Sequence, residues 1–321
     1  MNRSPGRRVW LLGCGSAATL IIVVLFFALY QGCKTAWSVY TVPMSTRQIT
    51  ITPREALGPG TLPVAFENAE GDLVPGWYKQ GENGATVLLL HGLGATRAQL
   101  AGTGRMLRDE GYGVLMIDQR GHGEHTRDLT TFGRAESVDA LAAVQWLRNR
   151  PEVDGDRIGI YGASMGATTC IYAAAKDPDL ACAVADSSYA SLERQAYHDL
   201  NMPRSPVKVP KWLHSLTVRF FMFCSQFIIG KWAGYPCPED VVGDIKCPVF
   251  LIHGELDSRI DAESLDVLSR AAREGGVDVT EWLVRGEEHC KYRDSPEFRR
   301  RLLAFFAEHL TSRTEALRSR F

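Results

Sequence analysis

The sequence predicts an α/β fold: a mostly parallel sheet flanked by helices, preceded by an N-terminal transmembrane helix. Short apolar runs alternate with amphipathic stretches of helical length, which is the pattern of parallel βαβ units. Near the N-terminus a long run without charged side chains has the length of a membrane span. The 321 residues are 45% apolar and 23% charged, as in ordinary globular chains. Their net charge of -1 argues against a nucleic-acid-binding protein.

The uncharged run extends from Val9 to Tyr30. At about 1.5 Å per residue it would be about 33 Å long, enough for a hydrocarbon core of about 30 Å. Three arginines precede it (Arg3, Arg7 and Arg8), and only Lys34 follows closely. Because positive flanks stay inside, we expect a cytoplasmic N-terminus and a large extracytoplasmic part, in a cell inner membrane.

Two alternatives to an uncleaved anchor are weaker. A signal peptide has a shorter apolar core, of about 7–15 residues, and ends at small residues, whereas Ala28-Leu29-Tyr30 fits such a cleavage site poorly. Lipidation at Cys14 or Cys33 is disfavoured by the residues before each cysteine. The expected parts are a cytoplasmic terminus (1–8), a transmembrane helix (9–30), a linker (31–45), the α/β domain (46–312) and a tail (313–321).

The expected strands follow in order. A first strand over Arg47–Thr52 precedes a hairpin of Val64–Asn68 and Leu73–Tyr78, which turns at Glu70-Gly71-Asp72. Continuous apolar runs then suit strands that are buried on both faces. They are Thr86–Leu90, Gly113–Ile117, Arg157–Tyr161, Ala181–Ala185 and Pro248–Ile252, with Val279–Val284 as the last strand.

Amphipathic helices are expected between the strands. Gly111 ends the first of them, and Gly275-Gly276 ends the fourth. The five stretches are Arg97–Asp109, Glu136–Asn149, Ala167–Lys176, Ala262–Arg273 and Pro296–Leu310.

Residues 190–246 interrupt this alternation and are interpreted as a lid insertion. Within it, Trp212–Gly230 has a helical apolar stripe formed by Leu213, Leu216, Phe220, Phe223 and Phe227. A second membrane span is the alternative, but polar and charged residues interrupt it (His214, Arg219 and Gln226). The opposite face is also apolar, with Phe221, Met222 and Ile228, so this helix can contact both a pocket and a bilayer surface.

Gly162–Gly166 has the pattern G-x-S-x-G between a predicted strand and a predicted helix. Such a turn exposes its central serine, and glycines on either side avoid collisions with the turn. The helix N-terminus also favours negative charge there. The pattern therefore predicts Ser164 as a nucleophile; the alternative is a small-residue turn with a buried serine.

His91–Gly94 follows the strand Thr86–Leu90 and is a second glycine-containing turn. Backbone N–H groups at this place, together with the one after a nucleophile, form an oxyanion hole. We therefore expect Leu93 and Met165 to donate their backbone N–H groups. An ordinary glycine turn is the alternative.

Asp257 and His289 each come just after a strand, where a parallel sheet gathers its functional groups. With Ser164 they give the order Ser, Asp, His, which predicts a catalytic triad. Asp118 and Asp186 also follow strands and are alternative partners for the histidine; we expect both to be structural.

His122 and His125 lie close together and suggest a metal site. Apart from Glu124, no further ligand-type residue stands near them at ligand spacing, so a metal is disfavoured. No metal or organic cofactor is predicted. His253 is interpreted as a packing residue.

The chain resembles the α/β-hydrolase superfamily over about residues 60–310. It is most similar to single-domain hydrolases related to prolyl oligopeptidases and serine aminopeptidases. Six blocks in order carry the resemblance: HGLG (91–94), DQRGHGEH (118–125), GASMG (162–166), DSSYASL (186–192), CPVFLIHGELD (247–257) and GEEH (286–289). The resemblance implies that Ser164 is the nucleophile, His289 the general base and Asp257 the residue that orients it.

The expected activity is that of a membrane-anchored serine hydrolase on a small-molecule ester or acyl substrate, through an acyl-enzyme intermediate. A peptidase of the aminopeptidase type and a thioesterase remain alternatives on the same triad. The propeller domain of prolyl oligopeptidases is absent, which weakens an inference to peptides. A non-catalytic binding protein is disfavoured, because no triad member is missing.

Overall fold

The computed structural model describes residues 5–41, 48–202, 209–228 and 236–311. The chain forms two units. One comprises Met1–Val39 and Ala196–Gly234, and the other comprises Tyr40–Gln195 and Tyr235–Phe321. We call them the helical unit and the sheet unit, and describe each by itself.

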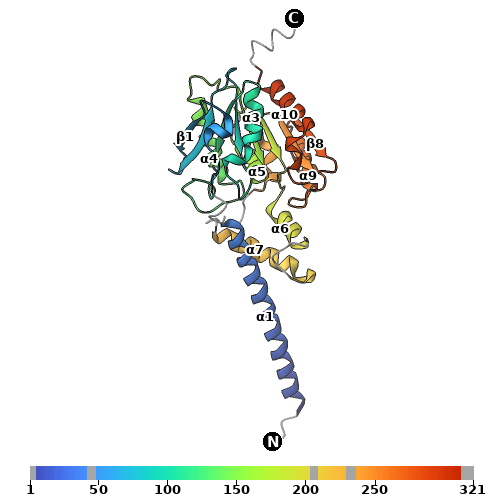
Figure 1. Cartoon of the computed structure of the whole chain (residues 1–321). Coiled ribbons are helices and arrows are strands. Elements are labelled where there is room, and N and C mark those ends of the chain that lie inside the picture. The colour runs from blue at the N-terminus through green and yellow to red at the C-terminus, as the bar shows by residue number, and fades with distance from the viewer. Residues whose placement is uncertain (1–4, 42–47, 203–208, 229–235, 312–321) are drawn as a thin grey trace. The chain divides into compact units, whose positions relative to one another are not determined.

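The sheet unit contains an eight-stranded sheet in the order β1-β2-β4-β3-β5-β6-β7-β8 (Figure 1). β1 pairs with β2 and β2 with β4 in antiparallel fashion, and all other pairs are parallel. The predicted α/β fold and its hairpin are thus confirmed. The strands are β1 Leu62–Glu67, β2 Leu73–Lys79, β3 Thr86–Leu90, β4 Gly113–Ile117, β5 Ile158–Ala163, β6 Cys182–Asp186, β7 Val249–Gly254 and β8 Val279–Val284.

Helices cover both faces of the sheet because its central strands are apolar on both sides. In β3, Leu88 and Leu90 belong to one core, and Val87 and Leu89 to the other. The first core is covered by α4 (Glu136–Arg148), α5 (Met165–Ala174) and α9 (Glu263–Glu274). The second is covered by α2 (Pro53–Leu57), α3 (Ala101–Asp109) and α10 (Pro296–His309). A short 3-10 turn, Arg97–Leu100, leads into α3.

The expected first strand, Arg47–Thr52, is wrong for the part that can be compared. Arg47 lies outside the described residues, and residues 48–52 form no strand. Thr52 instead caps α2: its N–H donates to Glu55 Oε2 at 2.7 Å, and Glu55 N–H donates to its hydroxyl at 3.3 Å. This capping box and the following Pro53 favour helix initiation over the alternating pattern.

In the helical unit, α1 runs without a break from Pro5 to Tyr40. We expected a linker from residue 31, but the helix continues through Gly32 to Tyr40, and the first proline after the apolar run is Pro43. Thr19–Trp37 is the one candidate membrane span found among the described residues. Its length and composition also suit a signal sequence.

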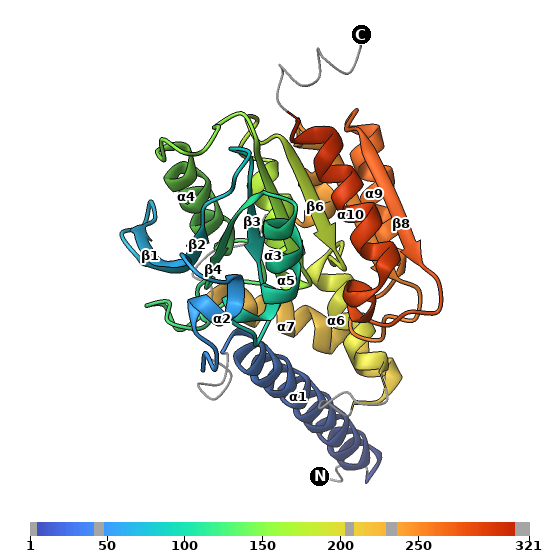
Figure 2. The same cartoon turned by 45° about the horizontal axis from the view of Figure 1, so that its top comes forward.

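The insertion contains α6 (Leu192–Asn201), a 3-10 turn (Lys211–Leu213), α7 (His214–Ile228), α8 (Pro238–Val241) and a second 3-10 turn (Val242–Asp244). The helix expected over Trp212–Gly230 forms as α7; Ile228 is its last residue, and residues 229–230 lie outside the described part. Both views show α7 lying across α1 (Figures 1 and 2). A disulfide joins Cys33 of α1 to Cys224 of α7. The lid role of the insertion stays a prediction.

Candidate active site

Ser164 lies on a tight turn between β5 and α5. Its backbone has φ 57° and ψ −119°, a strained conformation that only a closely packed turn maintains. A Cβ on Gly162 would come within 1.9 Å of Gly166 O, and one on Gly166 within 2.1 Å of Leu90 O. Both glycines are therefore required by contact with the backbone, as the G-x-S-x-G pattern predicted.

Asp257 and His289 lie on the loops after β7 and β8 and contact each other. His289 Nδ1 donates to Asp257 Oδ2 at 2.5 Å. The other carboxylate oxygen, Oδ1, accepts from the backbone N–H groups of Arg259 at 2.8 Å and Ile260 at 3.0 Å. The aspartate is thus fixed by its own loop and holds the imidazole through one ring nitrogen.

The Asp257 carboxylate remains charged in the folded protein. Burial by itself would raise its pKa, but hydrogen bonds from His253 and His289 outweigh burial, and its pKa lies below the usual range. His253 Nε2 lies 3.2 Å from Asp257 Oδ2. Interpreting His253 as a packing residue therefore missed a polar contact, although its position four residues before the aspartate was a signal.

The alternative carboxylates have other partners. Asp186 accepts from the hydroxyl of Tyr161 at 2.7 Å and from the hydroxyl of Tyr292. Asp118 is fully buried and pairs with Arg97 Nη1 at 2.7 Å. Of the three aspartates, Asp257 is the one that hydrogen-bonds His289 within the described part of the chain.

Two buried histidines hold the turn His91–Gly94. His91 Nδ1 lies 2.8 Å from Gly92 O, and His122 Nε2 accepts from the N–H of Gly94 at 2.9 Å. Burial lowers the pKa of each imidazole to about 4, and for His122 the neighbouring His91 lowers it further. Both rings are therefore neutral near pH 7 and act as fixed hydrogen-bonding groups.

The turn lies beside Ser164. A Cβ on Gly92 would be 3.3 Å from Ser164 Cβ, so the backbone here approaches the serine closely. The N–H groups of Leu93 and Met165, the two expected donors, have no hydrogen-bond acceptor among the described residues. Both are consequently available to a negatively charged oxygen of a bound molecule.

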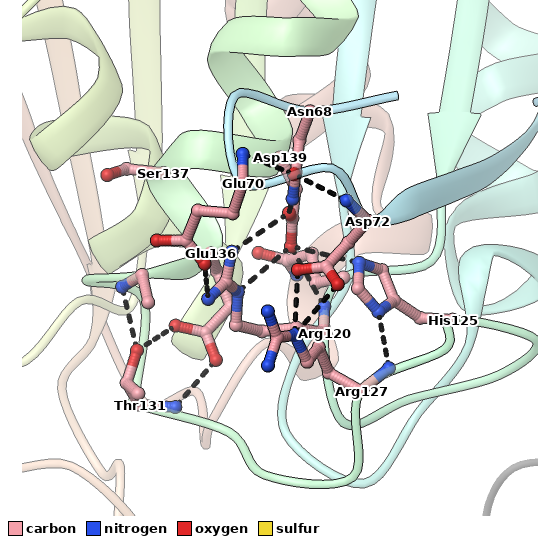
Figure 3. A network of polar contacts seen from close by, with 12 residues as sticks. Asn68, Glu70, Asp72, Arg120, His125, Arg127, Thr131, Glu136, Ser137 and Asp139 are labelled. Atoms are coloured by element: carbon pink, nitrogen blue, oxygen red, sulfur yellow. Dashed lines mark hydrogen bonds and ion pairs between the residues drawn. The ribbon is translucent and has the colours of Figure 1, made fainter. Parts of the chain in front are cut away.

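A polar network holds the loop after β4, which carries His122 and His125 (Figure 3). Arg120 Nη2 pairs with Asp139 at 3.2 Å, and Arg120 Nη1 pairs with Glu70 at 3.0 Å. His125 Nδ1 accepts from the N–H of Arg127, and its Nε2 lies 3.5 Å from Asp139 Oδ2. Both histidines that were considered as metal ligands thus have protein partners. His122 contacts backbone atoms, and His125 contacts the backbone and Asp139.

A buried cluster under the His289 loop was not anticipated. Cys290 has φ 53°, and its thiol lies 3.6 Å from Asp186 Oδ1. Burial raises the pKa of this thiol well above its usual value, so it stays protonated. With the Tyr292 hydroxyl on the same carboxylate, the cluster ties the residues after His289 to the end of β6. No sequence motif marks Tyr292 for this role.

The sequence is similar to those of several known proteins. The sequence profile of the prolyl oligopeptidase family matches residues 99–313. The uncharacterized protein YqkD of Bacillus subtilis is 28% identical over 232 residues, which are 72% of this chain and 73% of that protein. Dipeptidyl-peptidase 5 of Porphyromonas gingivalis is 27% identical over 191 residues, 58% of this chain but 27% of that protein.

Among solved structures, the esterase Pf2001 of Pyrococcus furiosus is similar, with a TM-score of 0.69 and 26% identity. The similarity covers 85% of this chain and 99% of the esterase. The similarity thus extends over nearly the whole esterase, but over only 27% of the dipeptidyl peptidase.

Proposed function

This chain belongs to the prolyl oligopeptidase family and is a serine hydrolase, and from that premise we propose that it cleaves carboxylic esters with Ser164, His289 and Asp257 as its triad. The observation that carries the proposal is the hydrogen bond of 2.5 Å between His289 Nδ1 and Asp257 Oδ2. It leaves Nε2 of the imidazole to act as the base toward Ser164, which is partly exposed on its turn.

In the proposed mechanism, Ser164 Oγ attacks the carbonyl carbon while His289 accepts its proton. The N–H groups of Leu93 and Met165 stabilise the oxyanion, an effect worth about 3–4 kcal/mol per donor in other enzymes. His289 then protonates the leaving alcohol. Water, activated by the same histidine, releases the acyl group and restores the serine. Asp257, charged throughout, stabilises the imidazolium that forms in both steps.

Esters are favoured as substrates by the similarity to the Pf2001 esterase, which covers 85% of this chain. A peptidase is the second candidate, favoured by the family assignment and by the match to dipeptidyl-peptidase 5. A thioesterase would use the same steps with a thiolate leaving group.

A substrate panel tests the proposal. Purified full-length protein is assayed against p-nitrophenyl esters, the matching thioesters and aminoacyl-nitroanilides, with Ser164→Ala as the matched control. We expect ester hydrolysis to dominate and a fluorophosphonate probe to label the protein at Ser164. Faster cleavage of the anilides would support the peptidase, and absence of labelling would support a non-catalytic protein.

We also propose that α1 anchors the protein in a membrane, with residues 1–8 in the cytoplasm and the hydrolase domain (46–312) outside it. The positive residues before the span support this orientation. The Cys33–Cys224 disulfide also supports it, since disulfides persist in oxidising compartments. Protease added to intact spheroplasts should digest the hydrolase domain. Protection of that domain would reverse the orientation, and a mature form starting near residues 31–34 would indicate cleavage.

A further inference from the structure

Helix α7 has large apolar side chains that are exposed to solvent. Val218, Phe221 and Cys224 are buried along one side of it, and Leu213, just before the helix, is buried too. On the other side Phe223 and Phe227 are 47% and 56% exposed, and Trp212, just before the helix, is 71% exposed. We call these three residues the aromatic arc. Exposed aromatic side chains gathered on one helix commonly mark an interaction surface.

The same helix is fixed to α1 at one point. A Cβ on Gly32 would lie 2.7 Å from Phe221 N, so the two helices cross with their backbones almost in contact. Ala28 and Ala36, one turn to either side of Gly32, are fully buried, which makes a small-residue face of the kind that lets helices approach closely. The Cys33–Cys224 disulfide lies next to the crossing and secures it.

The crossing point corresponds to the end of the apolar run. Gly32 is two residues beyond Tyr30, or about 3 Å along the axis at 1.5 Å per residue. Lys34, the first charged residue after the run, follows directly. Tyr30 and Trp37 are both exposed there, as in the aromatic belts where hydrocarbon meets headgroups. If the membrane span ends with the apolar run at Tyr30, α7 crosses α1 close to the membrane surface.

We propose that α7 lies in the plane of the bilayer surface and inserts its aromatic arc into the lipid beside α1. Arg219, which is exposed one turn before Phe223, can extend its guanidinium toward lipid phosphates while its stem stays at the apolar boundary. Lipid is the occupant because the arc lies on a helix bonded to the proposed membrane helix, whose residues Leu20–Phe27 are largely exposed and apolar. The inference rests on the proposed anchoring and is independent of the proposed hydrolysis.

The test places a photo-crosslinking amino acid, benzoylphenylalanine, at single positions of the full chain in phosphatidylethanolamine–phosphatidylglycerol vesicles. Separate variants carry it at Phe223 and Phe227. Ser215, exposed on the polar side of the same helix, is the matched control. Phe26, exposed on α1, reports whether the anchor is inserted at all. After irradiation, adducts are identified by mass spectrometry, and each sample is also assayed with a soluble ester.

We expect phospholipid adducts at Phe26, Phe223 and Phe227, with at least about fivefold less at Ser215, because apolar side chains enter the acyl boundary and polar ones do not. Adducts at Phe26 without adducts at Phe223 and Phe227 would overturn the inference. Adducts of these two positions to a second copy or another protein would overturn it as well. Absence of a lipid adduct at Phe26 would reject the anchoring and the inference together. Hydrolysis of the soluble ester in the same samples tests the proposed enzyme function separately.

Discussion

The sheet unit and the helical unit place their apolar side chains in opposite ways. In the sheet unit every residue of β3 and β4 is buried, and the polar loops at the strand ends are held by hydrogen bonds. In the helical unit small residues of α1 are inside, and large apolar residues such as Phe26 are exposed. The exposed apolar residues of α1 are those that the proposed anchoring places in lipid. The proposed catalysis and the proposed membrane attachment therefore involve separate residues, which can be changed independently.

The largest effect is expected at the nucleophile. Ser164→Ala should lower kcat by about 10³- to 10⁶-fold, as removal of a triad serine does elsewhere, without changing either unit. Ester turnover and fluorophosphonate labelling measure the loss, and circular dichroism with membrane fractionation checks that fold and attachment persist. Near-normal turnover would show that the sheet unit carries its chemistry at another residue.

The aspartates separate chemistry from stability within the sheet unit. Asp257→Asn should lower kcat by about 10²- to 10⁴-fold, because the amide no longer stabilises the charged imidazole. Asp186→Asn should instead lower the melting temperature, because Asp186 accepts from two buried tyrosines. Equal kinetic losses after correction for the folded fraction would contradict the assignment of Asp257.

The buried histidines predict a pH dependence that belongs to the sheet unit. The His91 pKa is near 4 when folded against 6.5 unfolded, so between these values the unfolded chain binds more protons. Stability should therefore fall as pH drops from 6.5 to 4, by about 3 kcal/mol for His91 at about 1.4 kcal/mol per unit.

Urea unfolding at several pH values measures this slope. His91→Gln, which removes one of the two titrating groups but retains a polar side chain, should reduce the slope, and His122 should account for the part that remains. An unchanged slope in the variant would assign the dependence to other groups.

The smallest effect on activity is expected from the disulfide. Cys224→Ser should weaken the helical unit by about 2–4 kcal/mol, a typical value for one bridge. Hydrolysis of a soluble ester should change less than about twofold, since neither cysteine belongs to the proposed triad or oxyanion hole. Limited proteolysis of the insertion reports the first effect. Cys33→Ser and the double variant should match the single one; a large kinetic loss would show that the two units are coupled.

Much of the fold could be predicted because periodicity and end signals are local. β3, β4 and β8 have the expected bounds. β3 and β4 are largely apolar runs, whereas β8 also contains the exposed Thr280 and Glu281. The strand predicted over residues 48–52 does not form, because the capping box at Thr52 and the following Pro53 start a helix there. α1 was underestimated at its end, because composition marks where apolarity stops and not where helical hydrogen bonding stops.

The residues of the candidate site that lie at strand ends and in ordered motifs could be predicted from the sequence. That reasoning indicated Ser164, Asp257 and His289, and the hydrogen bond between the last two agrees with it. Contacts between residues far apart in the sequence had no local pattern that could predict them. Tyr292 meets Asp186 over 106 positions, and Cys33 bonds Cys224 over 191. Such pairs depend on how the strands are ordered, which no local pattern specifies.

The tyrosines on Asp186 give the His289 loop an optical marker. Burial, reinforced by the charge of Asp186, raises the pKa of both Tyr161 and Tyr292 well above the usual value for phenols. In an alkaline absorbance titration near 295 nm, these two phenols should ionise only when the end of β6 opens. Burial also raises the pKa of Tyr78 and Tyr172, so the part of the late absorbance step that is lost in Tyr292→Phe would report the opening of the packing beneath His289.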